Sequence, residues 1–268
     1  MKFVFLDIDG TLLSFGQAQP PLSAVQAVRQ ARENGHQVYI NTGRCRCEVT
    51  DDITSIGFDG IICSNSLYIE ERGLCLEKHQ MEASRVQEIA QWLENEDVGF
   101  FFEGHDKVMA TKRYFEQLLP LVGKEVIERQ KKVFPAIQEA ALSFDGIGKI
   151  NFISRPGLCT KLKEQFGKLF QVNEWSFLGK DFGMGEITVL EASKANGVRY
   201  IIERHDAVKD DCYAFGDSAG DLSMIDFCGC GVAMGNAEDV LKQHADYITS
   251  DVDNDGLEKA FRHFGLIS

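Results

Sequence analysis

The pattern of apolar and polar residues divides the chain into parts of different character. Short apolar runs at residues 3–6, 38–40 and 61–63 predict strands that are buried on both faces. Between the first two runs, apolar residues at positions 25, 28 and 31 predict a helix that ends at Gly35. A second helix is expected from about residue 44 to 56. Strands that alternate with helices indicate an α/β fold with a doubly wound parallel sheet.

From about residue 80 the pattern changes. Helical patterns near 83–93 and 112–121 are mixed with strand-like runs at 99–102 and 149–154, and aromatic residues are dense. The stretch is long enough to form a small domain of its own. The alternating pattern resumes near residue 186. We therefore expect a core made of residues 1–80 and 187–268, with an inserted α/β domain at 81–186.

The composition narrows the class of protein. The chain has 268 residues, a formal net charge of −13 and eight cysteines. This acidity disfavours nonspecific binding to nucleic acid or to an anionic membrane. The first apolar run is too short for a signal peptide and no stretch approaches a membrane span, so we expect a cytoplasmic protein with reduced thiols. The Cys-x-Cys pairs at 45/47 and 228/230 lack the spacing of common zinc sites. The sequence does not predict an oligomeric state.

Two aspartates directly follow the first strand. Asp7 and Asp9 stand at i and i+2, so their side chains leave the strand end on the same side, and Gly10 then lets the chain turn. Two carboxylates held together repel, which raises one pKa unless a cation lies between them. Ligands of open α/β sheets bind at this end of the strands. The alternative is an Asp-rich turn with no chemical role.

Three later motifs remove most of this ambiguity. The second strand is followed by Asn41-Thr42-Gly43-Arg44, and a predicted helix opens with Ser193-Lys194. Another apolar run is followed by Gly216-Asp217-Ser218-Ala219-Gly220-Asp221. In this order, with the residues at 7–11, they resemble the four motifs of haloacid dehalogenase-like phosphatases. The stretches at 231–237 and 245–256 make the chain similar to the Cof-type subgroup of sugar-phosphate phosphatases. The resemblance covers roughly residues 1–80 and 187–268.

The resemblance implies a fold and a reaction. The inserted segment would be an α/β cap on a doubly wound core. Asp7 would be the nucleophile that forms an aspartyl-phosphate, and Asp9 would be the general acid and base. Mg²⁺ would be held by the side chains of Asp7 and Asp217 and by the backbone carbonyl of Asp9.

Further residues would bind phosphate or hold the others in place. The resemblance makes Lys194 the cation that binds phosphate. Thr42 and Gly43 suit a phosphate cradle, because a hydroxyl and amides at a helix N-terminus are good donors to an anion, and the amide of Ile8 could act similarly. Asp221, four residues after Asp217, would position Asp217, its metal-bound waters or Lys194.

Several positions stay open. Arg44 either contacts substrate or lies on the surface of a first helical turn, and the role of Asn65 is uncertain. Gly220 stands where Cof-type relatives usually have an Asn that donates to phosphate, so water replaces this contact or the backbone requires glycine there. Ser66 stands where Gly is usual. These departures bear on efficiency and substrate range.

The predicted function is Mg²⁺-dependent hydrolysis of small phosphomonoesters. Sugar phosphates are the leading substrates, with pyridoxal phosphate or nucleotides as alternatives, so the expected partner is a small phosphorylated metabolite. A sugar phosphomutase of the same superfamily is a second hypothesis. A catalytically weak protein that senses phosphate is a third.

Overall fold

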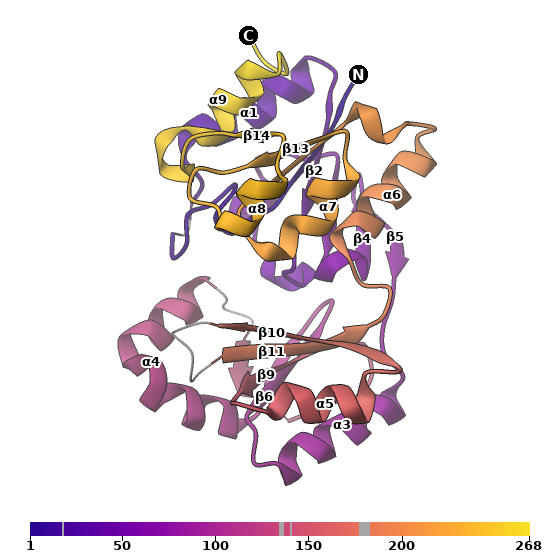
Figure 1. Cartoon of the computed structure of the whole chain (residues 1–268), viewed down its shortest axis with the longest axis vertical. Helices are drawn as coiled ribbons and strands as arrows, with labels where there is room; N and C mark the ends of the chain where they lie inside the picture. Colours follow the sequence, from indigo (N-terminus) through magenta and orange to yellow (C-terminus); the bar gives the residue numbers. More distant parts are fainter. Residues whose placement is uncertain (18, 134–136, 140, 177–182) are drawn as a thin grey trace. The chain divides into compact units, whose positions relative to one another are not determined.

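The computed structural model describes residues 1–17, 19–133, 137–139, 141–176 and 183–268. These residues form two compact units (Figure 1). The first unit combines Met1–Arg44, Val49–Lys78 and Ser193–Ser268, so it contains both termini. The second unit combines Cys45–Glu48 with His79–Ala192.

The first unit is built on a mostly parallel sheet. Its strands follow the order β14-β13-β12-β1-β2-β3-β4-β5, and β4 and β5 run antiparallel to their neighbours. The central strand β1 pairs with β12 on one side and β2 on the other, which places the carboxyl ends of all three at one edge. The strands are β1 Phe3–Leu6, β2 Gln37–Asn41, β3 Gly60–Cys63, β4 Tyr68–Glu71, β5 Leu74–Lys78, β12 Cys212–Gly216, β13 Cys230–Ala233 and β14 Tyr247–Ile248.

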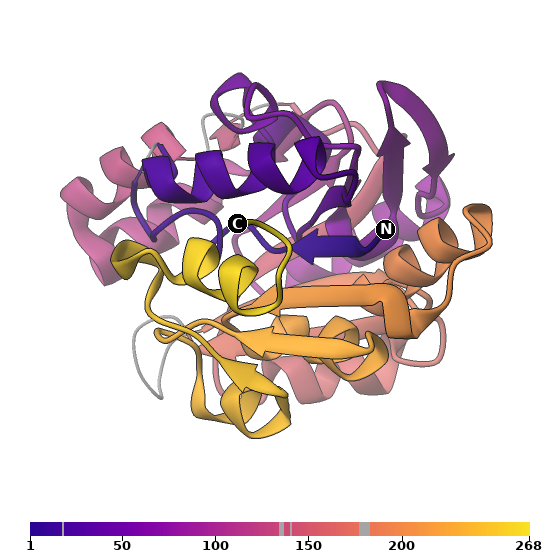
Figure 2. The same cartoon turned by 90° about the horizontal axis from the view of Figure 1, so that it is seen from above.

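Helices cover both faces of this sheet (Figure 2). Val4 and Leu6 of β1 join a hydrophobic cluster with α1 and α9, whereas Phe3 and Phe5 join another with α6, α7 and α8. The alternation follows from the two-residue period of a strand. The predicted doubly wound sheet is therefore confirmed. The helices are α1 Leu22–Glu33, α2 Asp51–Thr54, α6 Lys194–Arg204, α7 Leu222–Phe227, α8 Asp239–His244 and α9 Gly256–His263.

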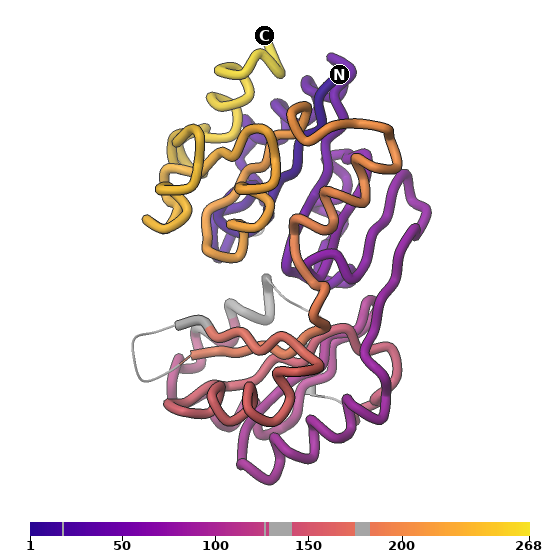
Figure 3. The backbone as a smooth tube through the Cα atoms, turned by 45° about the vertical axis from the view of Figure 1, so that its right-hand side comes forward, coloured from indigo at the N-terminus to yellow at the C-terminus, as the bar shows by residue number. Residues whose placement is uncertain are grey.

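The second unit, whose backbone is traced in Figure 3, has a separate sheet. Its strand order is β10-β11-β9-β6-β7-β8, and all described pairs except β7–β8 are antiparallel. Helices α3 and α5 share a hydrophobic cluster with Phe100, Phe102 and Phe152 of this sheet. Tyr114 of α4 stacks edge-on against Phe101, whose side chain leaves β6 on the opposite face. The elements are α3 Ala83–Asn95, β6 Phe100–Gly104, β7 Val108–Ala110, α4 Lys112–Val133, β8 Ile137–Glu139, β9 Ile147–Ser154, α5 Leu158–Phe166, β10 Phe170–Ser176 and β11 Gly183–Val189.

The structure differs from the predicted boundary near residue 186. We expected the core sheet to resume there, but Ile187 lies in β11 and pairs with Ile150 of β9 and Val172 of β10. This strand therefore belongs to the antiparallel sheet, and the chain returns to the first unit at Ser193. An apolar run identifies a strand, but it does not say which sheet the strand joins.

The predicted helix from about 44 to 56 is wrong. A 3₁₀ turn at Arg46–Glu48 and the short helix α2 occupy this stretch. Cys45 is buried in a hydrophobic cluster with Phe101 and Ala110 of the second unit, which draws the chain out of the first unit for four residues. None of the described helices is long and apolar enough to cross a membrane.

Candidate active site

The carboxylates predicted from the sequence meet at the carboxyl edge of the parallel sheet. Asp7 extends β1 and its amide donates to the carbonyl of Phe215 on β12, at 3.1 Å, while Asp217 follows β12. Gly10 permits their approach, because its φ is +81° and a Cβ there would lie 2.2 Å from Oδ2 of Asp217. Any other residue at position 10 would displace this carboxylate.

Lys194 joins two of these carboxylates. Its Nζ lies 2.7 Å from Oδ1 of Asp7 and 2.5 Å from Oδ1 of Asp221. The side chain comes from the first turn of α6, where the Oγ of Ser193 caps the helix by accepting from the amide of Asn196 at 3.2 Å. Burial alone would lower the pKa of Lys194, but the charges of Asp221 and Asp7 raise it above its usual value. The site therefore holds a permanent ammonium.

Asp221 is fully buried and holds the segment of Asp217 in place. Its Oδ2 accepts from the amides of Asp217 and Ser218, each at 3.0 Å, and its Oδ1 accepts from Lys194. Carboxylate oxygens of Asp7, Asp217 and Asp221 lie within 4.8 Å of one another, a spacing suited to a metal ion. Because both oxygens of Asp221 are engaged, Asp7 and Asp217 are the side chains that could face a cation.

The electrostatics of this pair favour such a cation. Burial raises the pKa of Asp7 to about 7, against the opposing charge of Lys194, and Asp221 and Asp9 raise it further. Burial raises the pKa of Asp217 to about 8, with Asp7 and Asp221 contributing. One lysine does not neutralise the carboxylates gathered here, and hard carboxylate oxygens are ligands that suit Mg²⁺. The residues present fit the predicted metal.

Arg44 is not the surface residue that one sequence interpretation allowed. Its side chain is 4% exposed and its guanidinium pairs with the carboxylate of Asp9. Nε donates to Oδ2 at 2.7 Å and Nη2 donates to Oδ1 at 2.5 Å. A two-pronged pair of this kind fixes both the position and the plane of the carboxylate. Neither the spacing of 35 residues nor the local pattern could have indicated this contact.

The turn after β2 is held by the turn after β3. The Oγ1 of Thr42 accepts from the amide of Arg44 at 3.2 Å, and the carbonyl of Thr42 accepts from the amide of Asn65, also at 3.2 Å. A Cβ at Gly43 would lie 3.6 Å from Oδ1 of Asn65. No α-helix begins at Gly43, so the expected contribution of a helix N-terminus at this point is wrong.

Ser66 and Gly220 are the positions that depart from the usual pattern. Ser66 has a φ of +80°, a conformation that favours glycine. Gly220 has no such conformation, and a Cβ there would meet only the Oγ of Ser218, at 3.5 Å. The expectation that the backbone requires glycine at 220 is therefore wrong.

The sequence did not assign Asn236 or Asn41 to the site. Asn236 donates from Nδ2 to the carbonyl of Gly10 at 2.8 Å, and its Oδ1 accepts from the amide of Val252 at 2.8 Å. Asn41, at the end of β2, donates from Nδ2 to the carbonyl of Lys194 at 2.9 Å. Buried Ile8 anchors the loop after the aspartates, since its carbonyl accepts from the amides of the three residues that follow Gly10. An asparagine that interrupts an apolar strand was the available signal for Asn41.

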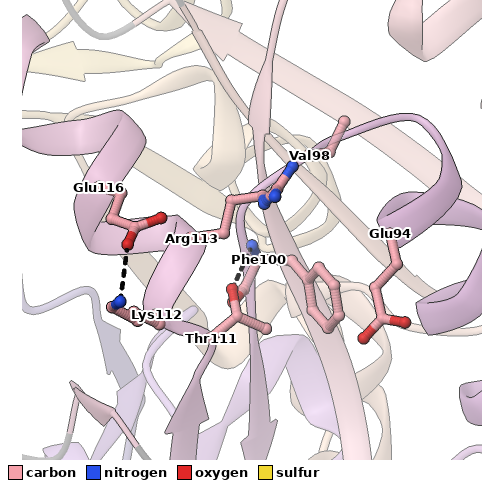
Figure 4. A pocket seen from close by; sticks show the side chains of 7 residues that line it. All are labelled: Glu94, Val98, Phe100, Thr111, Lys112, Arg113 and Glu116. Atoms are coloured by element: carbon pink, nitrogen blue, oxygen red, sulfur yellow. Dashed lines mark hydrogen bonds and ion pairs between the residues drawn. The ribbon is translucent and has the colours of Figure 1, made fainter.

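The second unit contains a pocket of its own. Its volume is about 430 Å³, and Figure 4 shows its lining residues Glu94, Val98, Phe100, Thr111, Lys112, Arg113 and Glu116. Lys112 is ion-paired with Glu116 at 3.2 Å, and Arg113 is paired with Asp97. The lining includes none of the candidate site residues, so the candidate site is the carboxylate cluster of the first unit.

Known proteins of similar sequence and structure identify the family of the chain. Residues 4–261 match the family described as haloacid dehalogenase-like hydrolases. The putative phosphatase YkrA of Bacillus subtilis is 28% identical over 99% of this chain and 98% of its own. The pyridoxal phosphate phosphatase YbhA of Escherichia coli is 24% identical over 96% of each chain.

Solved structures give the same result. BT1666 of Bacteroides thetaiotaomicron, described among the phosphatases of the HAD superfamily, superposes with a TM-score of 0.83 at 25% identity, over 100% of this chain and 96% of that chain. The sugar phosphatase BT4131, of HAD subclass IIB, gives 0.80 at 25% identity over 100% of both chains. The resemblance found in the sequence is confirmed, as is the prediction of a hydrolytic enzyme. The chain belongs to the haloacid dehalogenase-like hydrolases.

Proposed function

We propose that this chain is a Mg²⁺-dependent phosphatase of small phosphomonoesters, sugar phosphates first among them. The observation that carries the proposal is the ammonium of Lys194, 2.7 Å from Asp7 and 2.5 Å from Asp221, beside the carboxylate of Asp217. A buried nucleophile, a fixed cation and a second carboxylate are the parts that phosphoryl transfer to aspartate needs. The phosphatase and sugar phosphatase relatives support this reaction class.

In this proposal Asp7 attacks phosphorus with its unprotonated oxygen. A bond forms between that oxygen and phosphorus as the bond to the leaving oxygen breaks. Lys194 and the amides of Ile8 and Gly43, with the hydroxyl of Thr42, hold the phosphate oxygens. The side chains of Asp7 and Asp217 and the carbonyl of Asp9 would hold Mg²⁺, whose positive charge would offset repulsion between carboxylate and phosphate.

Asp9 moves the protons. It protonates the leaving oxygen in the first step and takes a proton from the water that hydrolyses the aspartyl-phosphate in the second. Arg44 donates a hydrogen bond to each oxygen of Asp9. One of these hydrogen bonds must break when the carboxyl turns toward the leaving group. Asp221 touches neither phosphate nor water in this scheme, and it positions Lys194 and the backbone of Asp217.

The second unit, His79–Ala192 with Cys45–Glu48, is proposed to act as the cap that selects the leaving group. A mutase must retain a second phosphate, which requires available cations. Lys149 of β9 lies 2.8 Å from Glu103 and 3.7 Å from Glu186, so its charge is already matched by two carboxylates. This pairing favours the hydrolase over the mutase. A cytoplasmic enzyme acting on a diffusible metabolite is the corresponding proposal for its location.

The proposal is tested with an aryl phosphate and then with a panel of phosphorylated metabolites. We expect turnover with Mg²⁺, none in EDTA, and recovery when Mg²⁺ is returned. Asp7→Asn should be inactive and should not be labelled by substrate phosphate in a rapid quench, whereas Lys161→Gln, at an exposed position of the second unit, should be unaffected. Full activity in chelator, or normal labelling of Asp7→Asn, would refute the mechanism. Release of sugar from glucose 1-phosphate, rather than its conversion to the 6-phosphate, separates hydrolase from mutase.

A further inference from the structure

Cys45 and Cys47 face one another at the point where the chain enters the second unit. Their Sγ atoms are 3.4 Å apart. Cys45 is completely buried, whereas Cys47 is half-buried. The amide of Cys47 donates to the carbonyl of His105 at 3.0 Å, which holds the turn in place.

We propose that Cys45 and Cys47 are a reversible oxidation site, at which a peroxide converts the two thiols to a disulfide. The site has no part in the proposed hydrolysis. The consequence inferred below, lower turnover of the oxidised enzyme, does rest on the proposed function.

The geometry permits the bond. Residues i and i+2 are at most about 7 Å apart along the backbone, which overlaps the roughly 4.4–6.8 Å between Cα atoms in disulfides. The sulfurs must close from 3.4 Å to a bonded distance of about 2.0 Å, so a shift of the turn suffices. The ring closed by neighbouring residues is small and strained, and strained disulfides are the ones that cellular thiols reduce readily.

The two thiols differ in a way that orders the steps. The hydrogen bond with Cys47, together with burial and the charges of Glu48 and Glu103, raises the pKa of the Cys45 thiol far above its usual value. Cys45 is therefore protonated and buried while Cys47 is a thiol, and Cys47 is the sulfur that a peroxide reaches first.

The reaction balances with peroxide as the only oxidant. The thiolate of Cys47 attacks one peroxide oxygen, the O–O bond breaks, and with a proton taken up this gives a sulfenic acid and water. The sulfur of Cys45 then attacks the sulfur of Cys47 while its proton passes to the departing hydroxyl group. The S–S bond forms and the S–O bond breaks, releasing a second water. A dithiol such as dithiothreitol reverses the change and is itself oxidised.

A metal site is the competing interpretation of this cluster. Donor atoms of Cys45, Glu48 and Glu103 lie within 4.8 Å of one another. However, Oε2 of Glu103 lies 2.8 Å from Nζ of Lys149, and its Oε1 accepts from Asn151 at 2.7 Å. A cation bound there would face the ammonium of Lys149 across one carboxylate. The arrangement therefore favours thiol chemistry.

The site lies one peptide bond from Arg44. The amide of Arg44 donates to Oγ1 of Thr42, and its carbonyl accepts from the amide of Ser64 at 2.8 Å. The backbone here is not slack, so a movement at Cys45 should be passed on to Arg44. Formation of the disulfide between Cys45 and Cys47 should shift Arg44 and weaken its hydrogen bonds to Asp9. We therefore expect the oxidised enzyme to turn over more slowly.

Peptide mapping tests the bond directly. The folded protein is treated with hydrogen peroxide, unfolded in an excess of alkylating reagent so that buried free thiols are blocked as well, and cut with trypsin. Cleavage after Arg44 and Arg46 separates the two cysteines, so the disulfide appears as a dipeptide of residues 45–46 held to the peptide that starts at Cys47. We expect this linked pair in the wild type and in Cys75→Ser, whose exposed thiol lies elsewhere, and its loss after dithiothreitol. Cys47→Ser should not form it.

Activity and metal content complete the test. Wild type should lose more than half of its aryl phosphatase activity on oxidation and regain it with dithiothreitol, whereas Cys47→Ser should be active and insensitive. Absence of the linked peptide would overturn the site, whatever the activity. Full activity of completely linked enzyme would overturn its effect on turnover. One equivalent of zinc retained by wild type and lost in Cys47→Ser would overturn the assignment in favour of a metal. An inactive reduced enzyme would instead refute the proposed function and leave the peptide result standing.

Discussion

Arg44 holds Asp9 through two hydrogen bonds, of 2.7 Å from Nε and 2.5 Å from Nη2, and its side chain is nearly inaccessible to solvent. The proposed general acid and base is thus oriented by a residue 35 positions away, before any substrate is bound. A lysine keeps the charge but cannot reproduce the planar fork.

Arg44→Lys should therefore slow turnover while leaving phosphate binding largely intact. We expect a fall of about a hundredfold, at the lower end of the ~10²–10⁴-fold that general acid–base catalysis contributes. Steady-state kinetics on an alkyl phosphate would measure the effect, and an aryl phosphate with an acidic leaving group should show a smaller one. Equal losses with both substrates would mean that Arg44 does not act through Asp9.

The metal-free protein should become less stable as the pH rises. The pKa of Asp7 is about 7 and that of Asp217 about 8, whereas an unfolded aspartate has a pKa near 3.8. Between these values the folded state binds more protons than the unfolded state, so the free energy of unfolding falls as the pH increases. Urea titrations in EDTA at several pH values between about 5 and 9 would record the decline.

Asp217→Asn provides the matched variant for that experiment. It removes one of the two titrating carboxylates, so its metal-free stability should depend less on pH and exceed that of wild type at alkaline pH. Mg²⁺ should stabilise the wild type there and have little effect on the variant. A variant with the same pH dependence as wild type would contradict the charge repulsion inferred at this site.

Gly220→Asn should strengthen phosphate binding. The position has room for a side chain and an ordinary backbone conformation, so the substitution should fold. If the amide reaches phosphate, the gain is at most ~1.5–3 kcal/mol, the value of one hydrogen bond to a charged group. Inhibition by inorganic phosphate or vanadate would measure it against Gly220→Ala, which adds a Cβ without a donor. Equal inhibition of the two variants would show that water does not stand in for an asparagine here.

Ser66→Gly should stabilise the protein. Ser66 adopts a φ of +80°, where a Cβ is strained, and it is largely buried between β3 and α6. Relief of that strain is offset in part by the greater freedom of glycine in the unfolded chain, so we expect a gain of about 1 kcal/mol or less. Thermal or urea unfolding would detect it. Ser66→Ala, which keeps the Cβ, should show no gain, and stabilisation by alanine would point to the hydroxyl instead.

The sequence predicted those parts of the site that depend on local order. Each of these residues lies next to a predicted element: Asp7 and Asp217 directly follow strands, and Lys194 opens a helix. Parallel strands bring their carboxyl ends to one edge of the sheet. It missed the contacts between distant segments, such as Arg44 with Asp9 and Asn236 with Gly10. Tertiary packing determines which residues are partners in these contacts, and it produces no periodic pattern in the sequence.

The errors in the fold have the same origin. The stretch after Arg44 has helical spacing, but burial of Cys45 in the second unit outweighs that propensity. The apolar residues of β11 would suit either sheet, and only pairing with β9 and β10 decides between them. Propensity predicted the strand, whereas long-range pairing determined its place.

The position of β1 has a consequence for synthesis on the ribosome. Strand β1 is made long before one of its two partners, because it lies between β2 and a strand that begins at Cys212. Until that residue emerges, β1 presents an unpaired apolar edge, and unpaired edges recruit other chains. Messages truncated ahead of Cys212 should therefore yield aggregating fragments that carry Asp7 and Asp9 but lack Asp217 and Asp221. Synthesis of residues 212–221 therefore supplies both the strand that covers the exposed edge of β1 and the remaining carboxylates of the site.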